Sequence, residues 1–286
     1  MKNAMITLLT FYLFSLSSQA NSRFDDVTIS SQQLSKSTYM FTGSGGNIGV
    51  SAGEDGILII DDQFAPLADK IENELAKIKQ GSPKYIINTH YHGDHVGGNE
   101  HFGAHGTIMA HHNVLKRLKS NKDIDAKALP VITYDNGISI HFNNDTLKVV
   151  HLKPGHTDGD SVVVWDDLSV VHMGDLFFKD HFPYVDLKGG GSVKGYRDNV
   201  AHVLNIITDK TKVIPGHGAL ATKKDLMKFK LMMDESIHWM EQQIAAKKTI
   251  TEIKKSGLPS KLKPWSWRFI TEDKWINTLY EDLSNQ

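Results

Sequence analysis

Short runs of aliphatic and β-branched residues in the first half of the chain predict strands. The first three such runs are residues 38–42, 47–52 and 57–60. Glycine-rich turns separate these runs, so a β-meander is expected. Residues 65–80 carry apolar side chains at intervals of three or four and predict a helix instead, and residues 84–87 predict a buried strand.

The second half of the chain predicts two hairpins followed by helices. One hairpin pairs residues 138–142 with 146–152, and the other pairs residues 161–165 with 168–173. Helical spacing is found at residues 111–118, 192–208 and 222–248, with a short strand at residues 212–214. Two shorter helical patterns lie around Trp265 and Trp267, which we expect to pack against the rest of the domain. Strands and helices thus mix along the chain, which indicates an α/β fold.

Four of the predicted strands end in polar loops that contain glycine. These loops are residues 88–98, 154–160, 174–175 and 215–218. Loops that a rigid sheet holds in place are where catalytic and binding groups usually lie. We therefore expect the functional site at the strand ends.

The first of these loops predicts a metal site. His90, His92, Asp94 and His95 fall within six positions, among several glycines. Imidazole and carboxylate are the ligands that zinc and similar divalent ions favour. Glycine lets the backbone curl, so these side chains can point at one volume.

The later loops supply enough further ligands for two ions. His156 completes a nitrogen-rich set with His90 and His92. His217 completes a mixed set with Asp94 and His95, and Asp175 could bridge the two sets. Seven ligands suit two Zn²⁺ ions per chain, each four- or five-coordinate.

These motifs resemble those of the metallo-β-lactamase superfamily of hydrolases. The series His-Tyr-His-Gly-Asp-His, Gly-His-Thr, Gly-Asp and Gly-His-Gly occurs in order, and the resemblance covers roughly residues 39–220. It implies an αββα sandwich in which two mixed sheets lie face to face, with helices outside and metals at one edge. We expect residues 21–221 to form this catalytic domain and residues 222–286 to form a C-terminal helical extension packed on it.

Comparison within the superfamily narrows the expected chemistry. Asp175 stands where some lactamases place a cysteine ligand, and the complete set of seven looks like that of glyoxalase II, lactonases and exported relatives. Residues 176–182 do not clearly reproduce the glutathione-binding residues of glyoxalase II. The resemblance implies a dinuclear zinc hydrolase of acyl bonds in a β-lactam, lactone, ester or thioester. Asp94 would also act in catalysis, by orienting the attacking water.

Three other functions stay open at this point. A persulfide dioxygenase of the same fold would hold one iron through two histidines and an aspartate, and the complete second set argues against it. A phosphodiesterase is disfavoured because no basic groove is evident. A protein that binds metal without catalysis is also disfavoured, because it would not need all seven ligands.

Composition and the N-terminus bear on location and partners. The 286 residues carry a formal net charge of −1, which gives no electrostatic footprint for nucleic acid. The chain has no cysteine, so metal ligands must be nitrogen and oxygen. Residues 1–20 show the pattern of a cleavable signal peptide, which predicts a periplasmic or secreted protein without stable membrane insertion. A periplasmic location makes β-lactam the leading small-molecule substrate.

Residues outside the seven ligands receive weaker predictions. Asp61, Asp158 and Asp160 are candidates to orient the ligand histidines through hydrogen bonds. His181 could face the substrate because it follows Asp175 closely in the chain. We expect the remaining histidines to be structural. The sequence does not indicate the oligomeric state.

Overall fold

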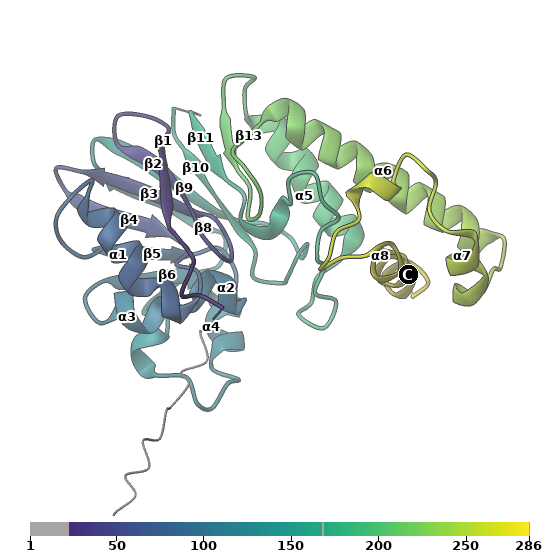
Figure 1. Ribbon diagram of the computed structural model, residues 1–286, viewed down its shortest axis with the longest axis horizontal. Coiled ribbons are helices and arrows are strands. Elements are labelled where there is room, and N and C mark those ends of the chain that lie inside the picture. The colour runs from purple at the N-terminus through teal and green to yellow at the C-terminus, as the bar shows by residue number, and fades with distance from the viewer. Residues whose placement is uncertain (1–22, 168, 286) are drawn as a thin grey trace, which may run out of the picture.

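The computed structural model describes residues 23–167 and 169–285, and two β-sheets lie face to face between layers of helices (Figure 1). The expected αββα sandwich is confirmed. The predicted signal peptide, residues 1–20, lies outside the described residues. Within the described part of the chain, no helix has the length and apolar character needed to cross a bilayer.

The first sheet has seven strands in sequence order. They are β1 (Ser30–Gln33), β2 (Thr38–Thr42), β3 (Ile48–Gly53), β4 (Gly56–Ile60), β5 (Tyr85–Asn88), β6 (Thr107–His111) and β7 (Ile132–Tyr134). The pairs from β1 to β4 are antiparallel, whereas those from β4 to β7 are parallel. The parallel strands β4 and β5 are almost wholly buried, as their continuous aliphatic sequence requires.

The second sheet has six strands in the order β13-β12-β11-β10-β9-β8. They are β8 (Gly137–Phe142), β9 (Asp145–His151), β10 (Ser161–Trp165), β11 (Val170–His172), β12 (Lys212–Ile214) and β13 (Ala221–Thr222). Aliphatic side chains from both sheets meet around the fully buried Trp165 and form the core between them. The two predicted hairpins are present as β8–β9 and β10–β11.

Helices cover the outer faces and make the connections. They are α1 (Ala68–Ala76), α2 (Gly93–Val96), α3 (Asn99–Gly103), α4 (His112–Leu118), α5 (Val193–Ile206), α6 (Lys223–Ala245), α7 (Ile250–Ser256) and α8 (Glu272–Leu283). Four short 3₁₀ turns are η1 (Ala65–Leu67), η2 (Ala126–Ala128), η3 (Gly174–Leu176) and η4 (Lys263–Trp265). The helix expected at residues 65–80 is therefore shorter than predicted, since Pro66 begins it as a 3₁₀ turn.

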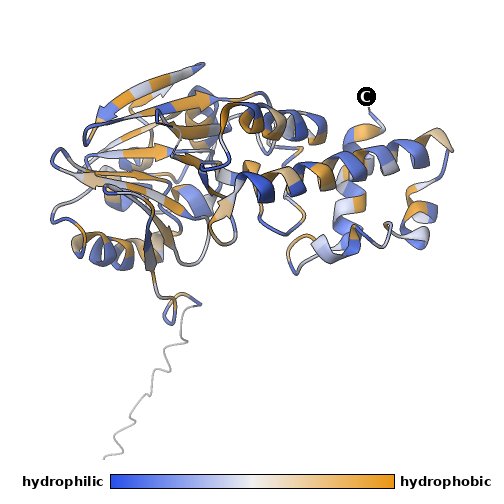
Figure 2. Ribbon diagram, turned by 90° about the horizontal axis from the view of Figure 1, so that it is seen from above, coloured by the Kyte–Doolittle hydropathy of each residue, from blue (hydrophilic) through white to orange (hydrophobic). Residues whose placement is uncertain are grey.

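The C-terminal helices extend the sandwich on one side. Figure 2 shows α6 running from the sheets towards α7 and α8. Helix α6 begins after Thr222, which forms a capping box with Asp225. These polar residues precede the apolar face of the helix. Trp275 of α8 is fully buried, donates a hydrogen bond to Ser236 of α6 at 3.1 Å and stacks on Phe182. Helix α8 is thus joined to the segment that follows Asp175.

Candidate metal centre

The loop that follows β5 is held in place by one buried aspartate. Asp61, at the end of β4, accepts hydrogen bonds from the backbone N–H and the hydroxyl of Thr89, both at 2.8 Å. Asp61 has a positive φ of 64°, which turns its carboxylate towards this loop. Because β4 and β5 are parallel neighbours, their ends meet at the same edge, and the loop begins there.

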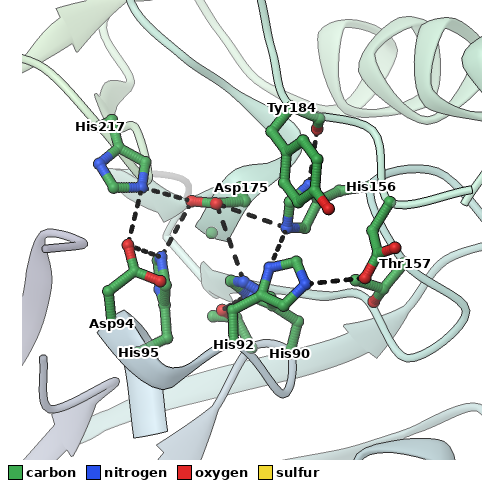
Figure 3. A network of polar contacts seen from close by, with 12 residues as sticks. His90, His92, Asp94, His95, His156, Thr157, Asp175, Tyr184 and His217 are labelled. Atoms are coloured by element: carbon green, nitrogen blue, oxygen red, sulfur yellow. Dashed lines mark hydrogen bonds and ion pairs between the residues drawn. The ribbon is translucent and has the colours of Figure 1, made fainter. Parts of the chain in front are cut away.

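The structure brings all seven predicted ligands together at this edge (Figure 3). They form two groups whose candidate ligand atoms lie within 4.8 Å of one another: His90, His92, His156 and Asp175 in one, and Asp94, His95 and His217 in the other. The members of each group come from different strand ends. The fold as a whole, and not one loop, therefore brings the seven side chains together.

Asp175 lies between the two groups, as expected for a bridging carboxylate. Its Oδ2 atom is 3.8 Å from Nε2 of His90 and 3.4 Å from Nε2 of His156. Its Oδ1 atom is 3.0 Å from Nε2 of His95 and 3.3 Å from Nε2 of His217. Each carboxylate oxygen thus faces one group.

Two of the ligand histidines are oriented from the β4 side. Nδ1 of His95 donates to Oδ2 of Asp61 at 2.7 Å, and this contact turns its Nε2 towards Asp175. Nδ1 of His90 lies 3.0 Å from the hydroxyl oxygen of Thr89. That hydroxyl gives its proton to Asp61 and can therefore accept from His90.

The other two members of the nitrogen-rich group are oriented from the opposite side. Nδ1 of His156 donates to the backbone carbonyl of Tyr184 at 2.7 Å. Nε2 of His92 donates to Oδ2 of Asp186 at 3.0 Å, and the Tyr91 hydroxyl donates to the same oxygen. His92 therefore presents Nδ1 to the cluster, whereas His156 presents Nε2.

Asp186 contacts the candidate ligand His92, and the sequence analysis did not identify it. It lies eleven positions after Asp175 in an irregular segment, and no spacing marks it. The glycine turn at residues 189–191 is the only local signal, since the Gly189 N–H donates to Oδ1 of Asp186 at 2.8 Å. The sequence analysis did not connect that turn with a ligand histidine.

Of the three predicted orienting aspartates, only Asp61 contacts a ligand ring. Asp158 forms a two-pronged ion pair with Arg117, at 2.6 and 2.7 Å, so its predicted role is wrong. Asp160 accepts hydrogen bonds from the backbone N–H and hydroxyl of Thr157. It therefore shapes the loop that carries His156 without contacting the ring.

Electrostatics differ between the two groups. Burial lowers the pKa of His156 to about 4 and holds the pKa of His90 well below its usual value. Both rings are thus neutral, the form that binds metal. Burial alone would also lower the pKa of His217, but the carboxylates of Asp175 and Asp94 raise it to about 9. Burial likewise opposes ionisation of Asp175, yet His95 and His217 hold its pKa well below the ordinary range.

Several polar atoms of the cluster are buried without a well-aligned hydrogen bond among the described residues, although two of them lie 3.0 Å apart. They are Nε2 of His90, Nε2 of His95 and Oδ1 of Asp175. A buried polar atom without a partner costs about 1–3 kcal/mol. Because these atoms converge and belong to imidazole and carboxylate groups, the site fits divalent metal ions.

A cavity of about 480 Å³ opens onto the cluster. Its remaining walls are largely aromatic: Phe64, Phe178, Tyr184, Trp267 and Phe269, with Ser44, Gly45 and Arg268. Trp267 packs against the hydrophobic core, as expected, and it also lines the cavity. Trp265 is buried as expected. His181 stacks on Trp267 at 4.9 Å and does not line the cavity.

Comparison with known families agrees with this site. The sequence model described as the metallo-beta-lactamase superfamily matches residues 38–217. The chain belongs to this superfamily, whose members are mostly metal-dependent hydrolases.

Individual relatives are more distant. An uncharacterized protein of Mycobacterium leprae is 39% identical over 89 residues, which are 30% of this chain and 39% of that protein. A hydroxyacylglutathione hydrolase of Pelagibacter ubique is 30% identical over 141 residues, which are 47% of this chain and 51% of that enzyme. The matches thus span about half or less of these two relatives.

Solved structures share the fold at low sequence identity. A metallo-beta-lactamase from Pontibacter korlensis has a TM-score of 0.62 at 14% identity and covers 72% of this chain and 99% of its own. A sec-alkylsulfatase from Pseudomonas sp. has a TM-score of 0.70 at 13% identity, over 88% of this chain and 50% of its own. These similarities establish the architecture.

Proposed function

We propose that this protein is a dinuclear zinc hydrolase that opens acyl bonds, with β-lactam as the leading specific substrate. The observation that carries the proposal is the position of Asp175, whose two oxygens face two separate groups of ligands. A single ion would be bound by one group only. The other group and the second carboxylate oxygen of Asp175 would then bind no metal. Bound zinc ions would supply Lewis acidity and lower the pKa of a water molecule to near neutrality.

The protein residues hold and orient the reacting groups. His90, His92 and His156 would hold the first ion, and Asp94, His95 and His217 would hold the second, with Asp175 shared. Asp94 would also accept a hydrogen bond from the attacking water. No serine or cysteine nucleophile is required, so attack is direct. The aromatic walls of the cavity limit bulk water around the acyl group.

Two observations bear on the substrate. The predicted signal peptide favours a compound met outside the cytoplasm, and β-lactams act there. The similarity to a hydroxyacylglutathione hydrolase over 141 residues supports thioesters as part of the same acyl range. Residues 176–182 do not favour glutathione itself. Export to the periplasm is part of this proposal.

The alternative of one iron and redox chemistry is less well supported. It needs two histidines and one aspartate, whereas the second group here is complete and faces the cavity through Asp94 and His217. Elemental analysis of protein purified without added metal separates the two. About two zinc per chain supports the hydrolase, and about one iron without zinc would overturn it.

Activity is tested on metal-quantified protein with a panel of β-lactams, lactones, esters, thioesters and phosphodiesters. Turnover of an acyl substrate should fall at least a hundredfold in His92→Ala. The matched control is His238→Ala, on the exposed face of α6, which should retain full activity. Equal losses in both variants would contradict the assigned site.

A further inference from the structure

We propose that the cavity selects acyl substrates that carry an aromatic group beside the scissile bond and a carboxylate that pairs with Arg268. This inference rests on the proposed hydrolase function and names its substrate class. It is carried by the segment at residues 266–270, between η4 and α8, which supplies three consecutive residues to the cavity: Trp267, Arg268 and Phe269.

The aromatic side chains form one continuous wall. Phe178 stacks on His217 at 4.8 Å and contacts Trp267 at 6.1 Å. Trp267 meets Phe269 edge to face at 5.6 Å, and Phe269 meets Tyr184 in the same way at 5.6 Å.

This wall begins and ends at the metal centre. Phe178 touches the ligand ring of His217, and Tyr184 lies 5.6 Å from the ligand ring of His92. A group attached next to the scissile bond must therefore lie against aromatic faces. Aromatic rings of a substrate would gain the most binding free energy there. Stacked and edge-to-face ring pairs add about 0.5–1.5 kcal/mol beyond the free energy that comes from burying their surface.

Arg268 is the only arginine or lysine among the described residues that line this cavity. Its guanidinium has no hydrogen-bond or ion-pair partner in the described part of the chain. Neighbouring lysines differ, because Lys261 pairs with Glu235 at 2.7 Å and Lys263 with Glu272 at 3.5 Å. Lys274 is also engaged, since it lies 4.0 Å from the ring centre of Phe269 and donates to that residue's carbonyl.

The acidic lining residues do not satisfy Arg268. They are Asp94 and Asp175, and both belong to the metal centre. With those two carboxylates committed to cations, no acidic residue of the lining is free to pair with Arg268. A guanidinium binds a carboxylate through two parallel hydrogen bonds, so Arg268 fits a carboxylate at the far end of the substrate.

The segment that carries Arg268 is rigid at its base. The Trp267 N–H donates to the carbonyl of Ile270 at 3.1 Å, and Ile270 is fully buried. The indole of Trp267 donates to the carbonyl of Phe182 at 2.9 Å, and the Phe182 N–H donates to Trp265 at 2.8 Å. Arg268 therefore projects from a fixed turn, and little backbone order has to be gained on binding.

A pair of chromogenic esters tests the inference: 4-nitrophenyl phenylacetate and its 3-carboxy-4-nitrophenyl analogue. The metal-loaded protein should hydrolyse the carboxylated ester with a kcat/KM about 2–5 times higher, since Arg268 is exposed and an ion pair in contact with solvent is worth up to about 1 kcal/mol. Arg268→Ala should abolish that preference through KM, with kcat unchanged. Arg268→Lys should keep part of it, and Lys261→Ala should keep it all.

A second variant tests the aromatic half. Phe269→Ala should raise KM for the phenylacetyl ester and leave the corresponding acetyl ester unchanged. Phe269 is half exposed, so its truncation is not expected to unfold the protein. An equal change for both esters would overturn this half of the inference.

Binding gives a readout that does not depend on turnover. Calorimetric titration with the hydrolysis-resistant amide of the carboxylated ester should show about 2–5 times weaker binding to Arg268→Ala than to the parent. Equal dissociation constants would overturn the inference. Equal hydrolysis of both nitrophenyl esters by the parent would also overturn it while leaving the hydrolase function intact. If no acyl compound is hydrolysed, the proposed function fails, and the calorimetric comparison alone decides whether Arg268 recognises carboxylates.

Discussion

Asp175 shows how one buried side chain can organise a site. It is only 5% exposed and lies within 4 Å of four histidine rings. Burial opposes its charge, and the facing histidines His95 and His217 restore it. A buried carboxylate in this position carries a desolvation cost that an apolar side chain of similar size would avoid, which supports a role in binding cations.

Asp186 should matter for metal affinity although it is not a ligand. Asp186→Ala removes the acceptor that fixes the ring of His92, and the loss of such an orienting group typically weakens metal binding 10–100-fold. Competition with a chelator of known affinity measures the effect. Asp198→Ala, on the exposed surface of α5, is the matched control and should bind metal like the parent. Equal affinities for parent and Asp186→Ala would contradict the role.

A histidine pair away from the metal centre predicts an acid-sensitive element of stability. The rings of His111 and His151 stack at 3.5 Å, and burial together with His151 and His112 lowers the pKa of His111 to about 4. The acids that face the pair, Asp135 and Asp158, only partly oppose this shift. Because the folded-state pKa lies below the unfolded value of about 6.5, stability is full above pH 6.5 and is lost as the pH falls towards 4.

His111→Asn tests this titration. Asparagine can still cap α4 by accepting from the Asn113 N–H, as His111 does. Between pH 6.5 and 4.5 the parent should lose roughly 1–3 kcal/mol more unfolding free energy than the variant. Urea unfolding at several pH values measures the difference. His238→Asn should follow the parent curve, and a His111→Asn curve parallel to the parent would refute the assignment.

At the scale of elements, the site depends on the close approach of separate loops. The β2–β3 loop contacts α2 directly, since the Gly46 N–H donates to the carbonyl of Asp94 at 3.0 Å. A Cβ atom on Gly46 would overlap the ring of His95, which Asp61 holds in place. Glycine is required at position 46 because there is no room for a side chain. Its backbone conformation does not require glycine, because its φ is not positive.

Gly46→Ala should therefore displace a ligand ring. We expect at least a tenfold loss of metal affinity and a lower melting temperature, both measurable on purified protein. Gly93→Ala lies on the same side of the site and is the control, since its Cβ would meet nothing within 4 Å. If both alanine variants bind metal equally well, the steric argument is wrong.

At the scale of the whole molecule, the candidate metal centre lies between the ends of the two sheets. One set of candidate ligands follows β5 of the first sheet, and the others follow β9, β11 and β12 of the second. Bound ions would therefore connect the halves of the sandwich across its open edge. Metal binding to the folded state alone adds stability in proportion to its affinity.

Removal of metal should destabilise the protein as a unit. Dialysis against a chelator is expected to lower the melting temperature by roughly 5–15 °C, because a loss of a few kcal/mol at this size corresponds to several degrees. Scanning calorimetry before and after zinc is restored gives the value. His217→Ala should show a smaller change on chelation than the parent. An unchanged melting temperature on chelation would argue against a metal that bridges the sheets.

Much of this picture follows from local chemistry in the chain. The apolar runs 57–60 and 84–87 predict buried strands, and the glycine-flanked histidines after residue 88 predict a metal-binding loop. In contrast, β6 was not predicted, because its few apolar residues become a strand only when parallel neighbours lie on both sides. Asp186 was missed for a similar reason, since its partner His92 is 94 positions away.

The amino-acid sequence by itself indicated the seven candidate ligands through short histidine and aspartate motifs, and the resemblance that these motifs carry implied the family and the sandwich. Only the tertiary structure decided which ring nitrogen faces the cluster, that Asp61 and Asp186 hold those rings, and that residues 266–270 wall the cavity. Those features depend on contacts between segments far apart in the chain. Such contacts form only when the hydrophobic cores of both sheets and the C-terminal helices pack together.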